Sequence, residues 1–167
     1  MARRVFHSFR YKYDNWRVQQ VKQMGVLEGQ PLLSSNEWEK IKGAGDAEVK
    51  KWIDKQMSGK SCLVVLIGTA TAGRKLVEYE IEKAWNDKRG VVGLYIHNLK
   101  DLDGNQASKG RNPFDNFTVG LSKKRMSSVV KAYDPPFVSS TYVYNHIKDN
   151  LASWVEQAIE IRNNFSG

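Results

Sequence analysis

The sequence has few of the side chains that support redox or metal chemistry. Cys62 is the one cysteine among 167 residues, so an intramolecular disulfide is excluded. Because Cys62 opens a very apolar run, we expect a small buried hydrophobe rather than a nucleophile. The three histidines, His7, His97 and His146, are widely spaced and have no clustered acidic partners. We therefore expect no metal site.

Long apolar segments are also missing. No stretch approaches the roughly 18 consecutive apolar residues of a membrane span. The first eight residues lack the long apolar core of a signal peptide. From these two observations we expect a cytoplasmic protein that does not enter a membrane.

The sequence motifs of several enzyme classes are absent. There is no Gly-x-x-x-x-Gly-Lys-Ser/Thr loop and no Gly-x-Gly-x-x-Gly after a strand, so neither a P-loop NTPase nor a Rossmann dehydrogenase is supported. Gly-x-Ser-x-Gly, the usual esterase signal, is missing too. The acidic cluster that receiver proteins carry after their first strand is not found either.

What the sequence does have is an excess of positive charge and an ordinary globular composition. The formal charge is +8, with 41% hydrophobic and 26% charged residues, and the length suits a single domain over residues 1–167. The charge favours anionic partners. Lys and Arg are scattered and mixed with acids, apart from a short cluster at residues 123–125, which argues against a dedicated nucleic-acid module.

Two apolar runs indicate the fold. Residues 62–67 and 91–96 are almost continuously apolar and rich in β-branched side chains, as in strands covered on both faces. Between them, residues 74–88 have apolar side chains at helical spacing, so this part reads as a βαβ unit. We predict an α/β fold of the doubly wound, flavodoxin-like type, with a mostly parallel central sheet and helices on both faces.

The other elements are expected at both ends of this unit. Residues 3–9 alternate as a first strand, and apolar spacing predicts helices over 17–24 and over 46–57, the latter capped by Asp46. The turn-rich segment 98–136 is long for a loop and suggests functional elements or short irregular helices. We expect a last strand at 141–144 and a closing amphipathic helix at about 145–165.

Ligands of open α/β sheets bind beyond the carboxyl ends of the strands. There the loop 68–73 leads into a helix and is a candidate to offer backbone N–H groups to a phosphate. In that helix, Glu80 lies at the margin of the apolar stripe and should be partly buried. The pattern alone leaves two interpretations of Glu80 open, a functional carboxylate and an ordinary rim carboxylate paired with Arg or Lys.

Four segments, in order and at matching spacing, resemble the TIR-like proteins of the bacterial Thoeris antiphage defence system, the ThsB family. These are the first strand and its loop (4–11), a strand and helix with the Tyr79-Glu80-Ile81 motif (64–81), the next strand (93–97), and the loop with Asn112-Pro113-Phe114 (109–115). The likeness covers about residues 3–117 well, which makes these residues the expected core of a single TIR-like domain with a C-terminal extension.

The resemblance implies an enzyme that cleaves the nicotinamide-ribose bond of NAD+, an NAD+ nucleosidase or ADP-ribosyl cyclase that uses NAD+ as substrate and no metal. It implies that Glu80 is the catalytic residue. It places Phe6, Ser8 and the loop of Phe9, Arg10 and Tyr11 at the mouth of the pocket, and it makes Asn112 a candidate polar contact. Three structural alternatives stay open: Phe6 as a core residue, Tyr11 as a cover of the sheet edge, and Asn112 as part of an ordinary turn. His7 alternates to the other side of the strand from Ser8 and is left out of the predicted site.

The resemblance further implies an ADP-ribose-derived second messenger, such as a cyclic ADP-ribose isomer, that activates a separate effector protein. The family also implies an infection-derived trigger and self-association. Two alternatives stay open: a TIR-like interaction module that signals by assembly without catalysis, and a basic nucleic-acid-binding α/β protein with strongly salt-dependent binding.

Overall fold

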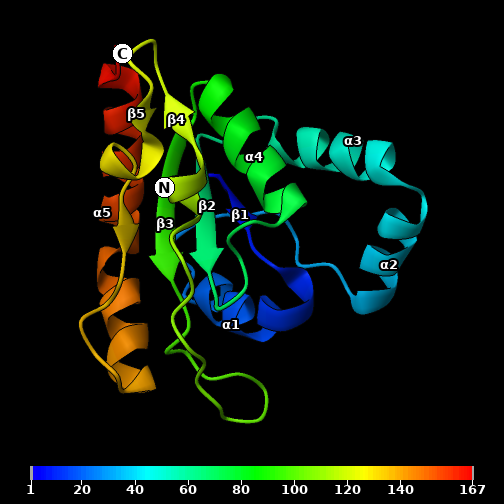
Figure 1. The fold of residues 1–167 in the computed structure, drawn as a ribbon. Helices are drawn as coiled ribbons and strands as arrows, with labels where there is room; N and C mark the ends of the chain where they lie inside the picture. The colour runs from blue at the N-terminus through cyan, green and yellow to red at the C-terminus, as the bar shows by residue number, and fades with distance from the viewer. Residues whose placement is uncertain (1, 167) are drawn as a thin grey trace.

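A parallel four-stranded sheet forms the centre of the protein in the computed structural model, which describes residues 2–166. Its order is β1-β2-β3-β6, all parallel (Figure 1). The strands are β1 (Val5–Ser8), β2 (Cys62–Ile67), β3 (Gly90–Tyr95) and β6 (Ala132–Tyr133). All residues of β1, β2 and β3 are buried. The continuous apolar sequence predicted this for β2 and β3, whereas in β1 the polar His7 and Ser8 are buried as well.

Helices cover both faces of the sheet, so the predicted doubly wound α/β fold is confirmed. On one face, α1 (Tyr11–Gln23) and α5 (Ser140–Asn164) pack on one set of alternating strand side chains. On the other, α3 (Asp46–Met57) and α4 (Lys75–Asn86) pack on the opposite set. The helix α2 (Ser35–Gly43) extends outward beside α3 (Figure 1).

The apolar spacing located most of these helices, with shifts at their ends. The helix α1 begins at Tyr11 rather than at residue 17, because its polar first turns are accommodated by pairing of the buried Asp14 and Arg17. In α3, Asp46 is the first helical residue and Gly45 occupies the N-cap position that was predicted for Asp46. Cys62 is fully buried in β2, as expected, and burial raises the pKa of its thiol.

The strand predicted at residues 141–144 is wrong, because these residues form the first turn of α5. Val143 alternates with aromatic neighbours as in a strand, yet it also starts the buried helical stripe that continues through Ile147 and Leu151. The fourth strand is β6, which pairs with β3 over only two residues.

The long segment after β3 contains short elements rather than one open loop. They are the 3₁₀ helices η1 (Pro113–Asn116) and η2 (Met126–Ser128), and the antiparallel pair β4 (Thr118–Val119) and β5 (Lys124–Arg125). Phe114, Val119 and Met126 from this segment are buried against the α3 and α4 face of the sheet. The segment thus completes one of the two cores.

The free edge of β1 is covered by the segment that follows α1. The Gln30 side-chain amide donates to the carbonyl of His7 at 2.8 Å and accepts from the His7 N–H at 2.9 Å. Glu28 adds two backbone hydrogen bonds, to the N–H of Val5 and to the carbonyl of Arg3. From residue 2 to residue 166, no helix combines the length and apolarity that crossing a membrane requires.

Candidate functional site

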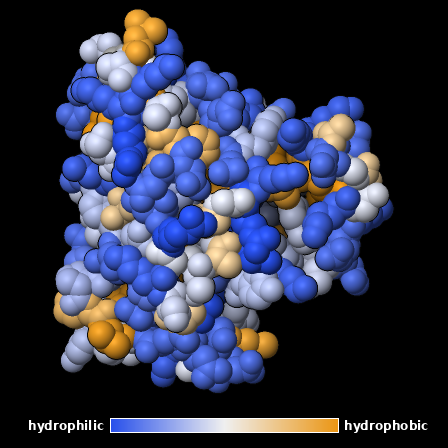
Figure 2. Space-filling view, viewed as in Figure 1, coloured by the Kyte–Doolittle hydropathy of each residue, from blue (hydrophilic) through white to orange (hydrophobic). Residues whose placement is uncertain are grey.

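A cavity of about 530 Å³ lies beside the carboxyl end of β1. Its walls come from β1, the start of α1, the segment 30–33, α2, α3 and the start of α4. Figure 2 shows apolar surface in the hollow between the sheet body and the arm formed by α2 and α3. The place agrees with the expectation that ligands of such sheets bind beyond the strand ends.

Glu80 from α4 reaches this cavity and is only 7% exposed. The Ser8 hydroxyl, at the last residue of β1, donates to the Glu80 Oε1 at 2.6 Å. Burial raises the pKa of Glu80 to about 8, and the hydrogen bond from Ser8 opposes that rise. Glu80 is therefore more deeply buried than the margin position predicted, and its hydrogen-bond partner is a serine rather than a surface Lys or Arg.

The charged residues that line the cavity around Glu80 are almost all basic. Of the described residues that line the cavity, Glu80 is the only acid, whereas six are Lys or Arg. The six are Arg10, Lys12, Lys22, Lys42, Arg74 and Lys75. An anionic ligand such as a pyrophosphate is favoured near these side chains, and a positive group is favoured near the carboxylate.

Five aromatic side chains form a continuous belt along the cavity wall. Phe6 meets Trp52 edge to face with ring centroids 6.3 Å apart, and Trp52 meets Trp38 in the same way at 6.2 Å. Trp38 stacks on Tyr11 at 5.6 Å, and Tyr11 lies 6.1 Å from Phe9. Trp38, Trp52, Tyr11 and Phe9 are half-buried, which leaves part of their ring surface accessible.

Most of the residues predicted from the sequence meet in this place. Phe6, Phe9, Arg10 and Tyr11 line the cavity with Glu80, and Ser8 reaches it through its hydrogen bond to that carboxylate. Arg10 lies over the Tyr13 ring, with its guanidinium carbon 4.0 Å from the ring centroid.

Asn112 is placed elsewhere. Its side-chain oxygen accepts from the N–H of Phe114 at 2.9 Å and so caps η1. It is not among the residues that line the cavity. A ligand contact by Asn112 therefore stays a prediction without support from this arrangement.

The sequence interpretation missed Trp38 and Trp52, and it excluded His7, which does line the cavity. The two tryptophans stand on helices that only the tertiary fold brings next to β1. Because they are far from residues 4–11 in the sequence, no local pattern predicts that they lie near β1. His7 is buried on the α1 face of β1, and burial together with the charge of Lys22 lowers its pKa to about 3.

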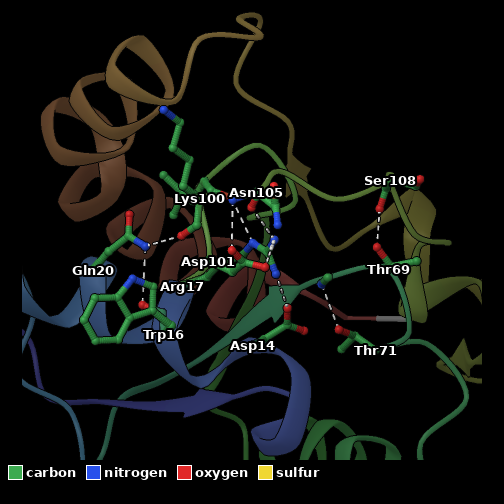
Figure 3. Close-up of polar contacts among 12 residues, drawn as sticks. Asp14, Trp16, Arg17, Gln20, Thr69, Thr71, Lys100, Asp101, Asn105 and Ser108 are labelled. Carbon is green, nitrogen blue, oxygen red and sulfur yellow. Dashed lines mark hydrogen bonds and ion pairs between the residues drawn. The ribbon is translucent and has the colours of Figure 1, made fainter. Parts of the chain in front are cut away.

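A separate buried polar cluster connects α1 to the loop after β3 (Figure 3). Arg17 donates to the carbonyls of Leu99 at 2.8 Å and Asn105 at 3.0 Å, and it pairs with Asp14 at 3.4 Å. The carboxylate of Asp14 is so close to Gly68 that a Cβ there would meet its oxygen at 2.2 Å. The cluster fixes the loops at this edge of the sheet.

The loop 68–73, expected to face a phosphate, has hydrogen bonds of its own. The Gly68 N–H donates to the Thr71 hydroxyl at 2.8 Å, and the Thr69 hydroxyl donates to the Ser108 carbonyl at 2.5 Å (Figure 3). Gly73, at the end of the loop, lines the cavity together with Arg74. Phosphate contact by the loop stays a prediction, and the last residue of the loop is the part that borders the cavity.

Comparison with known proteins agrees with the arrangement. The family described as "Thoeris protein ThsB, TIR-like domain" matches residues 6–101, which include β1, β2, α4 and Glu80. A curated protein of Bacillus cereus (strain MSX-D12), named "Putative cyclic ADP-D-ribose synthase ThsB1", is 36% identical over 120 residues. The match covers 69% of this chain and 62% of the relative, so the chain spans less than two thirds of that protein's length.

The family match covers more than half of the chain, and it contains the strand and the helix that bring Ser8 and Glu80 together. The chain belongs to the ThsB family of Thoeris TIR-like proteins.

Proposed function

We propose that this protein is an NAD+-consuming enzyme that breaks the nicotinamide-ribose bond and makes an ADP-ribose-derived signal. The observation that carries the proposal is Glu80, the one acidic side chain among the described residues around a basic, aromatic-walled cavity. The name of the Bacillus cereus relative, which refers to cyclic ADP-D-ribose synthesis, supports the same reaction class.

The chemistry requires one carboxylate near the ribose. When the bond between ribose C1′ and the nicotinamide nitrogen breaks, the electron pair leaves with nicotinamide, which departs neutral, and positive charge develops on the ribose. No general acid is needed, in contrast to glycoside hydrolysis with two carboxylates. A fixed carboxylate such as Glu80 stabilises that charge where it forms.

Ser8 is a positioning residue in this scheme. Its hydrogen bond to Oε1 holds the carboxylate and leaves the second oxygen, Oε2, free for the ribose. The same bond favours the ionised form of Glu80, in which the carboxylate can stabilise a cation.

The reaction ends when a nucleophile bonds to C1′ and releases its proton. An acceptor atom within the same molecule gives a cyclic ADP-ribose isomer, and water gives free ADP-ribose. A site that orients the flexible substrate and limits access of water favours the internal acceptor, and the aromatic rings of the cavity wall offer surfaces that can orient it. We propose a cyclic ADP-ribose isomer as the product, and a separate effector protein in antiphage defence as its receiver.

The first experiment is mass spectrometry of small molecules from cells that express the wild type or Glu80→Gln, with and without phage infection. We expect loss of NAD+ and a new ADP-ribose-derived species in infected wild-type cells. The substitution keeps the shape of the side chain and removes its charge, so turnover should fall roughly 10²- to 10³-fold.

Glu78→Gln is the matched control. Glu78 lies on the same helix, two residues away, and does not line the cavity, so its NAD+ loss should equal that of the wild type. If well-expressed wild-type protein leaves NAD+ and its derivatives unchanged in infected cells, the catalytic proposal fails for the triggers tested. The assembly-module alternative would then rank first.

A further inference from the structure

The aromatic belt and Glu80 occupy the same end of the cavity. Phe6 precedes Ser8 by two residues in β1, so both side chains point to the same face of the sheet. Ser8 bonds to Glu80, and Phe6 contacts Trp52, which in turn contacts Trp38. One carboxylate and three aromatic rings thus follow one another around the cavity, from β1 and α4 across α3 to α2.

The cavity also carries six basic side chains, which suit the anionic part of a dinucleotide. The faces of Trp rings attract cations, and a buried carboxylate does so more strongly when it is ionised. A flat ring that carries a positive charge gains both attractions when it lies between Glu80 and the tryptophans, whereas a neutral ring of the same shape gains neither.

Trp38 and Trp52 are placed for contact rather than for packing alone. Both stay half-buried, although Ile53, the neighbour of Trp52 on α3, is fully buried. Trp38 projects from α2, a helix with no fully buried residue of its own, and it meets Tyr11 and Trp52 at the cavity. Their accessible ring surface therefore faces the space that a ligand would fill.

We infer that Trp38 and Trp52, together with Glu80, form a subsite for a positively charged aromatic ring and make the cavity select the oxidised, pyridinium form of a nicotinamide dinucleotide over the reduced, neutral form. The inference rests on the proposed function, whose substrate it specifies, and it assigns roles to two tryptophans that lie outside the residue 4–11 segment. Selection of the oxidised ring also keeps the reduced dinucleotide from occupying the site unproductively.

The test compares a carbocyclic analogue of NAD+, which cannot lose nicotinamide, with its chemically reduced form. Both carry the same pyrophosphate, so the attraction of the basic side chains for that group cancels in the ratio of the two affinities. The ratio, measured by titration calorimetry on the full chain, then reports on all interactions of the protein with the charge of the ring. At pH 9 we expect the oxidised analogue to bind about tenfold more tightly.

The dependence of that ratio on pH separates the carboxylate from the tryptophans. Near pH 6 the ratio should fall to about threefold, because Glu80 is then protonated and only the rings discriminate. In Glu80→Gln the ratio should stay near that lower level at both pH values. Lys22, whose pKa burial lowers to about 8, loses its charge in the same range and then repels the oxidised ring less, so any remaining rise of the ratio in Glu80→Gln measures the contribution of Lys22. A rise in that variant as large as in the wild type would overturn the role of Glu80.

The tryptophan variants complete the design. Trp38→Leu and Trp52→Leu should reduce the ratio at pH 6 to near one, mainly through weaker binding of the oxidised analogue. Trp38→Phe and Trp52→Phe keep an aromatic face and should retain most of the preference for the oxidised analogue at pH 6. Trp16→Leu is the control, because Trp16 lies on α1, is 42% exposed and does not line the cavity.

The outcomes distinguish this inference from the proposed function. Equal affinities for the two analogues at pH 9 overturn the inference, even if Glu80-dependent loss of NAD+ is found in cells. A ratio that follows the expected pattern sustains the inference even if no turnover is detected, and the cavity would then bind NAD+ without consuming it. If all four variants at Trp38 and Trp52 keep the wild-type affinity ratio, Glu80 alone discriminates between the two analogues. That result would overturn the role of the two tryptophans.

Discussion

The two walls of the cavity differ in how extensively they pack against the rest of the protein. The inner wall consists of β1 and α4, whose Ser8 and Glu80 are buried and joined by a hydrogen bond between elements packed on the sheet. The outer wall consists largely of α2 and Trp38. No residue of α2 is fully buried, and its contacts to the rest pass through half-buried side chains such as Trp38 and Ile41.

The difference separates two tasks. A carboxylate that stabilises a developing charge must stay in place, and the packed inner wall provides that rigidity. A dinucleotide must enter and leave, and a helix with few buried contacts can open at little cost in free energy. We therefore interpret the inner wall as the reacting side and the outer wall as the closing side.

The same substitution on the two walls gives the sharpest test. Ile81→Ala on α4 removes a fully buried side chain and should lower the free energy of unfolding by about 2–5 kcal/mol. Ile41→Ala on α2 removes a half-buried one and should cost less than about 1 kcal/mol. Urea unfolding measures both. Similar losses at the two positions would break the comparison.

The buried carboxylate should make stability depend on pH. The pKa of Glu80 in the folded protein, about 8, lies above the ordinary value of 4.5, so folding favours the protonated form. Stability from this group is fully present below pH 4.5 and is lost as pH rises through 8. Glu80→Gln resembles the protonated side chain. As pH rises across this range, its free energy of unfolding should therefore come to exceed that of the wild type, by on the order of a few kcal/mol at pH 9.

Thermal unfolding of both proteins from pH 4 to pH 9 checks this. The Glu78→Gln variant serves as the reference, because Glu78 does not line the cavity. A constant difference between wild type and Glu80→Gln over the whole range would mean that Glu80 is hydrated in the folded protein. The inner wall would then be less closed than its burial indicates.

Ser8→Ala tests the contact that joins β1 to α4. Loss of the hydrogen bond removes the influence that opposes burial, so the pKa of Glu80 should rise further. At pH 7 we expect kcat/KM for NAD+ to fall about tenfold, a cost within the usual range for hydrogen bonds to charged groups. The rise of kcat/KM with pH should also move to higher pH. A lower rate with an unmoved pH profile would refute the role of Ser8 in ionisation.

The smallest effect is expected from Gly43→Ala at the end of α2. No atom lies within 4 Å of a Cβ built there, and alanine favours a helix over glycine by up to about 1 kcal/mol. If α2 opens independently, its amide protons should exchange more slowly while the midpoint of global thermal unfolding stays within about 1 °C of the wild type. A clear rise in that midpoint would show that α2 unfolds together with the body.

The sequence predicted best what depends on local pattern. Continuous apolar runs located β2 and β3, and the helical stripe beside Glu80 predicted that this carboxylate is partly buried. Features that depend on tertiary contact were not predictable in the same way. The strand β6 pairs over two residues only, and the approach of Trp38 and Trp52 to β1 follows from how α2 and α3 pack.

The side-chain bonds of Gln30 along β1 have a consequence for association between copies of the chain. An uncovered edge strand offers a row of unpaired N–H and carbonyl groups on which another chain can build a further strand. At β1 the Gln30 amide occupies both groups of His7, and the backbone of Glu28 satisfies the N–H of Val5. Extension of the sheet from one molecule into the next is therefore blocked at this edge.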